Sequence, residues 1–123
     1  MMGEQDEPGA AHLGRKIAAA IKATRRDVRI VASSDFSHYV PEAVARENDL
    51  YAIESLQSLD TREFYRRIEE RKVSACGYGP VAAMISACRT MGADEGRLLT
   101  YTTSGDVTGD RSEVVGYAAI AVI

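Results

Sequence analysis

The sequence predicts an α/β fold in which a mixed β-sheet is flanked by helices. Stretches with apolar residues at helical spacing alternate with short apolar runs that favour strands. The chain also contains the final run "VVGYAAIAVI", which is apolar on both faces of a strand. Such a strand is typical of a sheet that is covered on both sides. With 123 residues, the chain is long enough for a single domain with its own core.

The first half of the sequence predicts two amphipathic helices around one strand. Residues 8–24 form the first helix, because its apolar side chains recur at helical spacing. Residues 28–32 follow as a short buried strand. Pro41 opens the second helix, which extends to about residue 58, since proline is well tolerated at a first helical position. The apolar residues of the two helices are Leu13, Ile17, Ala20 and Ile21, and Val44, Leu50, Ile53 and Leu56.

The second half predicts two further helices and a hairpin. Asp60 caps one helix with Glu63 as its capping-box partner, and Phe64 and Ile68 face inward. Another helix begins at Pro80 and ends near Gly92. Residues 97–103 and 113–123 are predicted strands, which the turn-rich loop "SGDVTGD" joins as an antiparallel pair. Residues 1–3 are a candidate fourth strand.

Composition excludes several classes of protein. The net charge of −3 gives no electrostatic basis for binding nucleic acid. There is no run of about 18 apolar residues, so no membrane span is expected. The acidic N-terminal residues Glu4, Asp6 and Glu7 are unlike a signal peptide. Two cysteines are too few for a disulfide framework, and we expect a cytoplasmic protein.

The first candidate site is "SSDFSHY", which follows the predicted strand at residues 28–32. Loops at strand ends are where α/β folds place their sites. His38 is a candidate base or ligand, and Asp35, three residues earlier, is placed to orient its imidazole. The same polar residues have a structural interpretation, in which they cap the next helix and His38 is a surface residue. Both interpretations remain open at this stage.

The second candidate is Cys76 in "CGYGP", just before a helix N-terminus, where a thiolate is favoured. The alternative is a small buried apolar side chain beside a glycine turn. Cys88 lies on the apolar stripe of the following helix and belongs to the core. A transition-metal site needs about three protein ligands, and His38 and Cys76 supply two. His12 has no local partner and should face solvent.

Other motifs are weaker. "SGDVTGD" offers Asp106 and Asp110 but lacks the regular ligand spacing of a calcium loop, so turn formation explains it better. A phosphate-binding glycine loop is also absent, because "GYG" at residues 77–79 is too short.

Four segments together, "VASSDFSHY", "CGYGPVAAM", "YTTSGDVTGD" and "VVGYAAIAVI", resemble the C-terminal half of the Memo-like family. The resemblance covers essentially the whole chain. It implies a fold similar to class III extradiol ring-cleaving dioxygenases, which use non-haem Fe(II). It also implies that this chain lacks the N-terminal half, from which the family's two histidine metal ligands come.

The resemblance assigns roles to three residues. It makes Cys76 a metal ligand, His38 the acid/base residue beside the metal, and Asp35 a residue lining the same pocket. A thiolate is softer than the carboxylate of ring-cleaving enzymes, so copper is a candidate metal beside Fe(II). The resemblance thus implies a metal-dependent redox or dioxygenase-like protein of unknown substrate. With the two histidines missing, neither metal should bind tightly to this chain alone.

Two other hypotheses stay open: a scaffold module that binds a small molecule or peptide in the same cleft, and a fragment that folds without activity. Exposed sheet edges favour a homo-oligomer. The geometric prediction common to the site hypotheses is that the His38 and Cys76 side chains approach within about 4–8 Å, on the scale of a shared metal shell.

Overall fold

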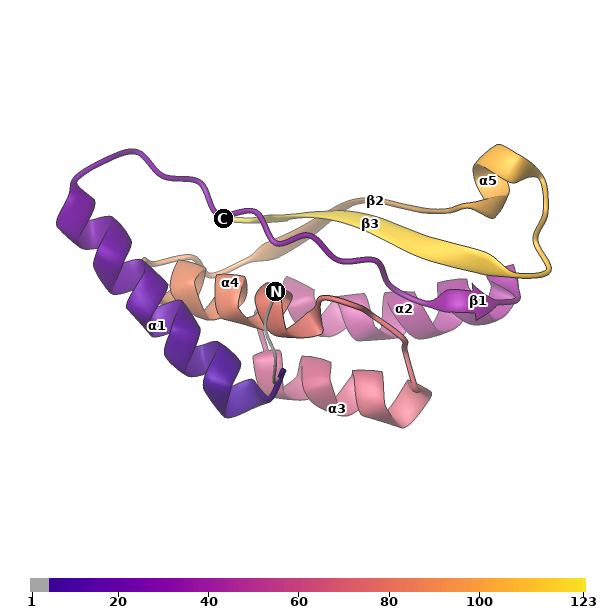
Figure 1. Cartoon of the computed structure of the whole chain (residues 1–123), viewed down its shortest axis with the longest axis horizontal. Helices are drawn as coiled ribbons and strands as arrows, with labels where there is room; N and C mark the ends of the chain where they lie inside the picture. The colour runs from indigo at the N-terminus through magenta and orange to yellow at the C-terminus, as the bar shows by residue number, and fades with distance from the viewer. Residues whose placement is uncertain (1–4) are drawn as a thin grey trace.

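A computed structural model of the protein describes residues 5–123 as a three-stranded sheet with its four longer helices gathered on one side (Figure 1). The predicted α/β class is confirmed. The elements are α1 (Glu7–Thr24), β1 (His38–Val40), α2 (Glu42–Gln57), α3 (Thr61–Arg71), α4 (Tyr78–Thr90), β2 (Gly96–Thr103), α5 (Gly105–Thr108) and β3 (Val114–Val122). The candidate strand at residues 1–3 lies outside the described residues.

The sheet has the order β1-β3-β2, and both pairings are antiparallel. The predicted hairpin is confirmed, since β2 pairs with β3 from Gly96 opposite Val122 to Thr103 opposite Gly116. The loop between them contains the short helix α5. On the other edge, β1 pairs with β3 only through His38 and Val40. The sequence predicts a mixed sheet, but among residues 5–123 both strand pairings are antiparallel.

The strand predicted at residues 28–32 is the main local error. These residues run as an extended chain beside β3 but join no strand pairing (Figure 1). The third strand is instead β1, ten residues later. The apolar sequence favours an extended chain, but a strand also needs a hydrogen-bonded neighbour, which among the described residues this stretch does not have.

The core lies between the sheet and the helices α2, α3 and α4. Phe64, Ile53, Leu56, Leu59 and Ile85 are fully buried there. The inner side of β3 adds partly buried apolar side chains, Ala118, Ile120 and Val122. The outer side of the hairpin is open, with Leu99 62% exposed and Tyr117 39% exposed. Within the described chain, the apolar final strand is therefore covered on one face, not on both.

Helix boundaries agree with prediction better than helix faces do. In α1 the buried residues are Ala10, Gly14 and Ala18, whereas Leu13 is 39% exposed. The face of α1 that packs on α4 consists of small residues because the two helices lie close together. A Cβ at Gly14 would lie only 2.4 Å from the Ala83 carbonyl oxygen. In α2 the expected inward residues Ile53 and Leu56 are buried, but Val44 and Leu50 are exposed.

Local capping signals explain the helix ends. The Asp6 carboxylate accepts from the Gly9 N–H at α1, and the Asp60 carboxylate accepts from the Glu63 N–H at α3. The predicted capping box is half formed, since the Glu63 side chain binds arginines instead of reaching back to Asp60. Gly92 follows α4 with φ of +107°, a left-handed conformation in which glycine ends a helix at no steric cost.

Candidate metal centre

The candidate site forms where the chain leading into β1 lies beside the turn before α4. Backbone contacts join the two segments, since the Cys76 N–H donates to the Asp35 carbonyl (3.3 Å) and the His38 N–H donates to Ser74 Oγ (2.7 Å). The Gly77 N–H donates to Ser34 Oγ (2.9 Å). A Cβ at Gly77 would lie 2.6 Å from the Ser33 carbonyl, so only glycine allows this approach. Two loops distant in sequence are thus fixed side by side.

The His38 imidazole is oriented by the backbone. Its Nδ1 lies 2.8 Å from the Ser74 carbonyl oxygen. A carbonyl only accepts hydrogen bonds, so Nδ1 of the neutral ring carries the proton and Nε2 keeps its lone pair. Nε2 lies 3.7 Å from Asp35 Oδ2, and the His38 side chain is 24% exposed. Nε2 is therefore the nitrogen that remains available to bind a metal ion or a proton, on the side of the ring that faces the carboxylate.

The Cys76 thiol completes the cluster. It is exposed, lies just before the N-terminus of α4, and accepts a hydrogen bond from the Asp35 N–H (3.3 Å). One ligand atom each from Asp35, His38 and Cys76 lies within 4.8 Å of the others. The predicted approach of the His38 and Cys76 side chains to each other is confirmed. The interpretation of Cys76 as a buried apolar side chain is wrong.

The donor set fits a transition metal. An imidazole nitrogen, a thiol sulfur and a carboxylate oxygen are ligands that iron, copper and zinc accept. Two ligands of one tetrahedral metal lie about 3.3–3.8 Å apart when its bonds are about 2.0–2.3 Å long. Ligand atoms within 4.8 Å of one another would need side-chain adjustments of about 1 Å, which part-exposed side chains can make.

A buried carboxylate on α2 accepts hydrogen bonds from the loop that carries His38. Asp49 of α2 is fully buried and accepts from Ser37 Oγ (2.6 Å), the Ser37 N–H (3.2 Å) and Tyr101 Oη (2.7 Å). Burial raises the pKa of Asp49 above 3.8, against the opposing effect of the hydrogen bonds from Ser37 and Tyr101. Burial and the bond to Asp49 also raise the pKa of Tyr101. Because Ser37 directly precedes His38, Asp49 helps to position the imidazole.

The sequence interpretation missed Asp49. Its signal is a carboxylate among apolar and small residues on the buried side of α2, between Ala45 and the pair Ala52 and Ile53. A charged group at such a position is rare unless it has several partners. Ser74 was missed as well: its hydroxyl accepts from the His38 N–H and its carbonyl contacts the His38 ring, but the two residues are 36 positions apart in sequence.

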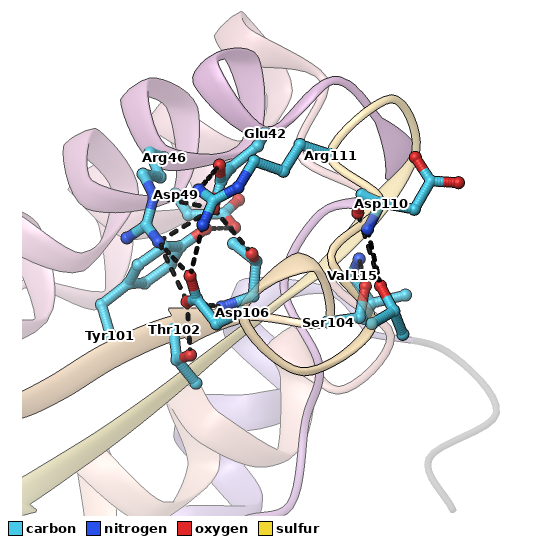
Figure 2. Close-up of polar contacts among 12 residues, drawn as sticks. Glu42, Arg46, Asp49, Tyr101, Thr102, Ser104, Asp106, Asp110, Arg111 and Val115 are labelled. Atoms are coloured by element: carbon cyan, nitrogen blue, oxygen red, sulfur yellow. Dashed lines mark hydrogen bonds and ion pairs between the residues drawn. The ribbon is translucent and has the colours of Figure 1, made fainter.

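A second polar network ties the loop after β2 to α2 (Figure 2). Asp106 accepts from Thr102 Oγ1 (2.7 Å), the Thr103 N–H (3.0 Å) and Arg46 (3.0 Å). Glu42 binds Arg46 (2.9 Å) and Arg111. Burial alone would raise the pKa of the Glu42 carboxyl, but hydrogen bonds from Thr103, Arg111 and Arg46 lower it. Since its charges pair with one another, the network is structural.

The remaining candidates take no part in the cluster. Asp110 accepts from the Ser112 N–H (2.9 Å) and Oγ (2.6 Å), so it forms a turn, as expected. His12 is exposed, as predicted. Cys88 is partly buried on α4, and burial raises the pKa of its thiol. No helix within residues 5–123 has both the length and the apolar character needed to cross a membrane.

Comparison with known proteins identifies the family. A family model described as Memo-like protein matches residues 1–121. The chain belongs to the Memo-like family. It is 49% identical over 121 residues to a MEMO1 family protein of Methanococcoides burtonii, which covers 98% of this chain and 46% of that protein. A relative in Methanothermobacter thermautotrophicus is 48% identical over 120 residues, which cover 98% of this chain and 43% of the relative.

A third relative, from Nitrosopumilus maritimus, is 44% identical over 123 residues, covering all of this chain and 44% of the relative. The Memo-like chain described here thus spans less than half the length of these curated relatives. The predicted family is confirmed, whereas the similarity to ring-cleaving dioxygenases and the roles of Asp35, His38 and Cys76 stay predictions.

Proposed function

We propose that Asp35, His38 and Cys76 are the part of a metal site that this Memo-like chain supplies to a metal-dependent redox protein. The observation that carries the proposal is the convergence of three different donor atoms within 4.8 Å, from two loops far apart in sequence. The fixed proton on Nδ1 supports it, because this tautomer leaves Nε2 free to bind. The metal would supply redox or Lewis-acid chemistry beside these residues.

Fe(II) and copper are the proposed metals. Sulfur ligation favours copper, while a mixed set of nitrogen, oxygen and sulfur also suits iron. Cys76 and His38 would hold the metal, and Asp35 would be a third ligand or a proton acceptor beside it. Relatives of more than twice this length have room for further ligands outside the matched portion. We therefore expect weak binding by this chain alone and leave the substrate open.

The experiment is a metal titration with matched variants. Co(II) serves as the first probe, because charge-transfer absorption reports bonding to sulfur, and anaerobic Fe(II) and Cu(I) follow. Cys76→Ala and His38→Ala should each weaken binding, and Cys76→Ala should remove the sulfur band. Cys88→Ala and His12→Ala are the controls, since they alter the chain's other cysteine and histidine.

Binding that is unaffected by Cys76→Ala and His38→Ala, or that Cys88→Ala abolishes, would overturn the proposal. So would a chain that is folded by circular dichroism and binds none of the three metals at millimolar concentration. Binding of an organic ligand without metal would instead favour the scaffold hypothesis.

A further inference from the structure

The helix α4 begins without a capping side chain of its own. Gly77 is its N-cap residue and has no side chain to accept a hydrogen bond. The first N–H groups of a helix have no acceptor within the helix, so they need acceptors from elsewhere. Ser34 Oγ accepts from the Gly77 N–H (2.9 Å), and Gln5 Oε1 accepts from the Gly79 N–H (3.0 Å). One cap of α4 therefore comes from a residue 74 positions earlier in the sequence.

The same Gln5 side chain also binds the backbone of Cys76. Its Nε2 donates to the Cys76 carbonyl oxygen (3.3 Å). A backbone N–H only donates and a carbonyl only accepts, so the two contacts together fix which end of the amide faces which group. A Cβ at Gly79 would lie 3.0 Å from Gln5 Cβ, so glycine at this position allows the close approach. Gln5 thus bridges both ends of the turn Cys76–Gly79.

The opposite side of this turn is held by the loop before β1. The Cys76 N–H donates to the Asp35 carbonyl (3.3 Å), and the Asp35 N–H donates to Cys76 Sγ (3.3 Å). Cys76 is exposed, so side-chain packing does not fix its position. Hydrogen bonds to the Cys76 backbone from Asp35 on one side and from Gln5 on the other hold the thiol beside His38.

We propose that Gln5 is a positioning residue for Cys76. Its amide nitrogen holds the Cys76 carbonyl, while its amide oxygen caps α4. Gln5 directly precedes Asp6, which caps α1, so two adjacent residues tie together the first turns of two packed helices. The consequence for metal rests on the proposed function: Gln5 sets the affinity of the site although it supplies no ligand.

Two variants separate the two contacts of Gln5. Gln5→Met has a similar volume and removes both hydrogen bonds. Gln5→Glu keeps an oxygen that accepts from the Gly79 N–H, and its negative charge is favourable at a helix N-terminus. An ionised carboxylate cannot donate, so Gln5→Glu loses the bond to the Cys76 carbonyl. Gln57→Met and Gln57→Glu are the matched controls, because Gln57 is the chain's other glutamine and lies exposed at the end of α2.

The first measurement needs no metal and follows amide hydrogen exchange by NMR in the whole chain. In Gln5→Met, the Gly79 and Cys76 N–H groups should both exchange about two- to tenfold faster, the factor that corresponds to one net hydrogen bond. In Gln5→Glu, the Gly79 N–H should exchange as in the wild type and only the Cys76 N–H should exchange faster. Both Gln57 variants should match the wild type.

The second measurement is the Co(II) titration. Co(II) affinity should fall about two- to tenfold in Gln5→Met and in Gln5→Glu, since both lose the bond to the Cys76 carbonyl. A loss in Gln5→Glu runs against the added negative charge, which by itself favours a cation. The urea midpoint should fall in Gln5→Met but not in Gln5→Glu, so affinity follows the Cys76 contact and not stability.

Unchanged exchange of the Cys76 N–H in Gln5→Met would overturn the inference. So would a Gln5→Glu variant with wild-type Cys76 exchange and wild-type Co(II) affinity, because Gln5 would then act only as a helix cap. A wild-type chain that binds no metal contradicts the proposed function, and hydrogen exchange at Cys76 still decides whether Gln5 positions this residue.

Discussion

Removal of the Asp49 carboxylate should destabilise the fold and displace His38. Asp49→Ala leaves three donors without their acceptor: the Ser37 N–H, the Ser37 hydroxyl and the Tyr101 hydroxyl. Ser37 is only 4% exposed, so water reaches its donors poorly. A buried unsatisfied donor costs about 1–3 kcal/mol. Removal of the buried charge offsets part of this cost. We expect the free energy of unfolding to fall by about 2–4 kcal/mol.

Asp49→Asn is the matched comparison. Its remaining oxygen still accepts from Ser37, and its amide can donate to the Tyr101 oxygen, because a hydroxyl both donates and accepts. We expect its free energy of unfolding to lie within about 1 kcal/mol of the wild type at neutral pH. Burial raises the pKa of Asp49 above 3.8. The stability of the wild type relative to Asp49→Asn should therefore rise as pH falls through that raised pKa toward 3.8.

Urea denaturation measures both changes. With an unfolding slope of about 1–2 kcal/mol per molar urea, Asp49→Ala should lower the midpoint by about 1–4 M. The metal titration provides a second measurement, in which Asp49→Asn binds like the wild type and Asp49→Ala binds more weakly. Equal midpoints for Asp49→Ala and the wild type would refute the inferred role of the carboxylate. If Asp49→Asn lowers the urea midpoint as much as Asp49→Ala does, the fold depends on the charge of Asp49 and not on its hydrogen bonds.

Two further predictions concern packing and pH. Helix propensity alone would make Gly14→Ala stabilising by about 1 kcal/mol, but the new Cβ would lie 2.4 Å from the Ala83 carbonyl oxygen. We expect Gly14→Ala to lower the free energy of unfolding, measured by heat or urea, by about 1–3 kcal/mol. An increase in this free energy would contradict close packing of α1 on α4. Arg66 and Arg67 lower the pKa of Glu63 from 4.5 to about 2. The Glu63 carboxylate therefore contributes to the free energy of unfolding above pH 4.5, and this contribution is lost as pH falls toward 2. Unfolding curves measured across this pH range should show a weaker pH dependence of stability in Glu63→Gln than in the wild type.

Helix positions could be predicted because their signals are local. Asp60 is the N-cap of α3 and Glu63 lies in its first turn, and the expected N–H to carboxylate bond forms there. The buried faces were less predictable. Leu50 is apolar but 41% exposed, while Asp49 beside it is fully buried. Which side of α2 faces the sheet depends on the partners Ser37 and Tyr101, and neither is near it in sequence.

Strand pairing was the least predictable feature. Residues 28–32 have strand composition without a hydrogen-bonded neighbour, whereas β1 has three residues and includes Tyr39 at φ of +56°. Its place is set by β3, through His38 opposite Val115 and Val40 opposite Val114. A pairing across more than 70 positions of sequence leaves no periodic signal in either segment. Composition therefore predicts an extended chain, and only the partner makes it a strand.

The site was predictable to the extent that its chemistry is carried by side chains at element ends. Its geometry depends on the sheet. A Cβ at Gly116 of β3 would lie 2.1 Å from Asp49 Oδ2 and 2.7 Å from Tyr101 Oη, so a hydrogen there lets the strand approach the buried carboxylate. Gly116 also accepts from the Phe36 N–H and donates to the Ser37 carbonyl. One residue of the apolar final strand therefore fixes both the loop that carries His38 and the carboxylate behind it. A side chain at Gly116 would disturb the cluster without touching Asp35, His38 or Cys76.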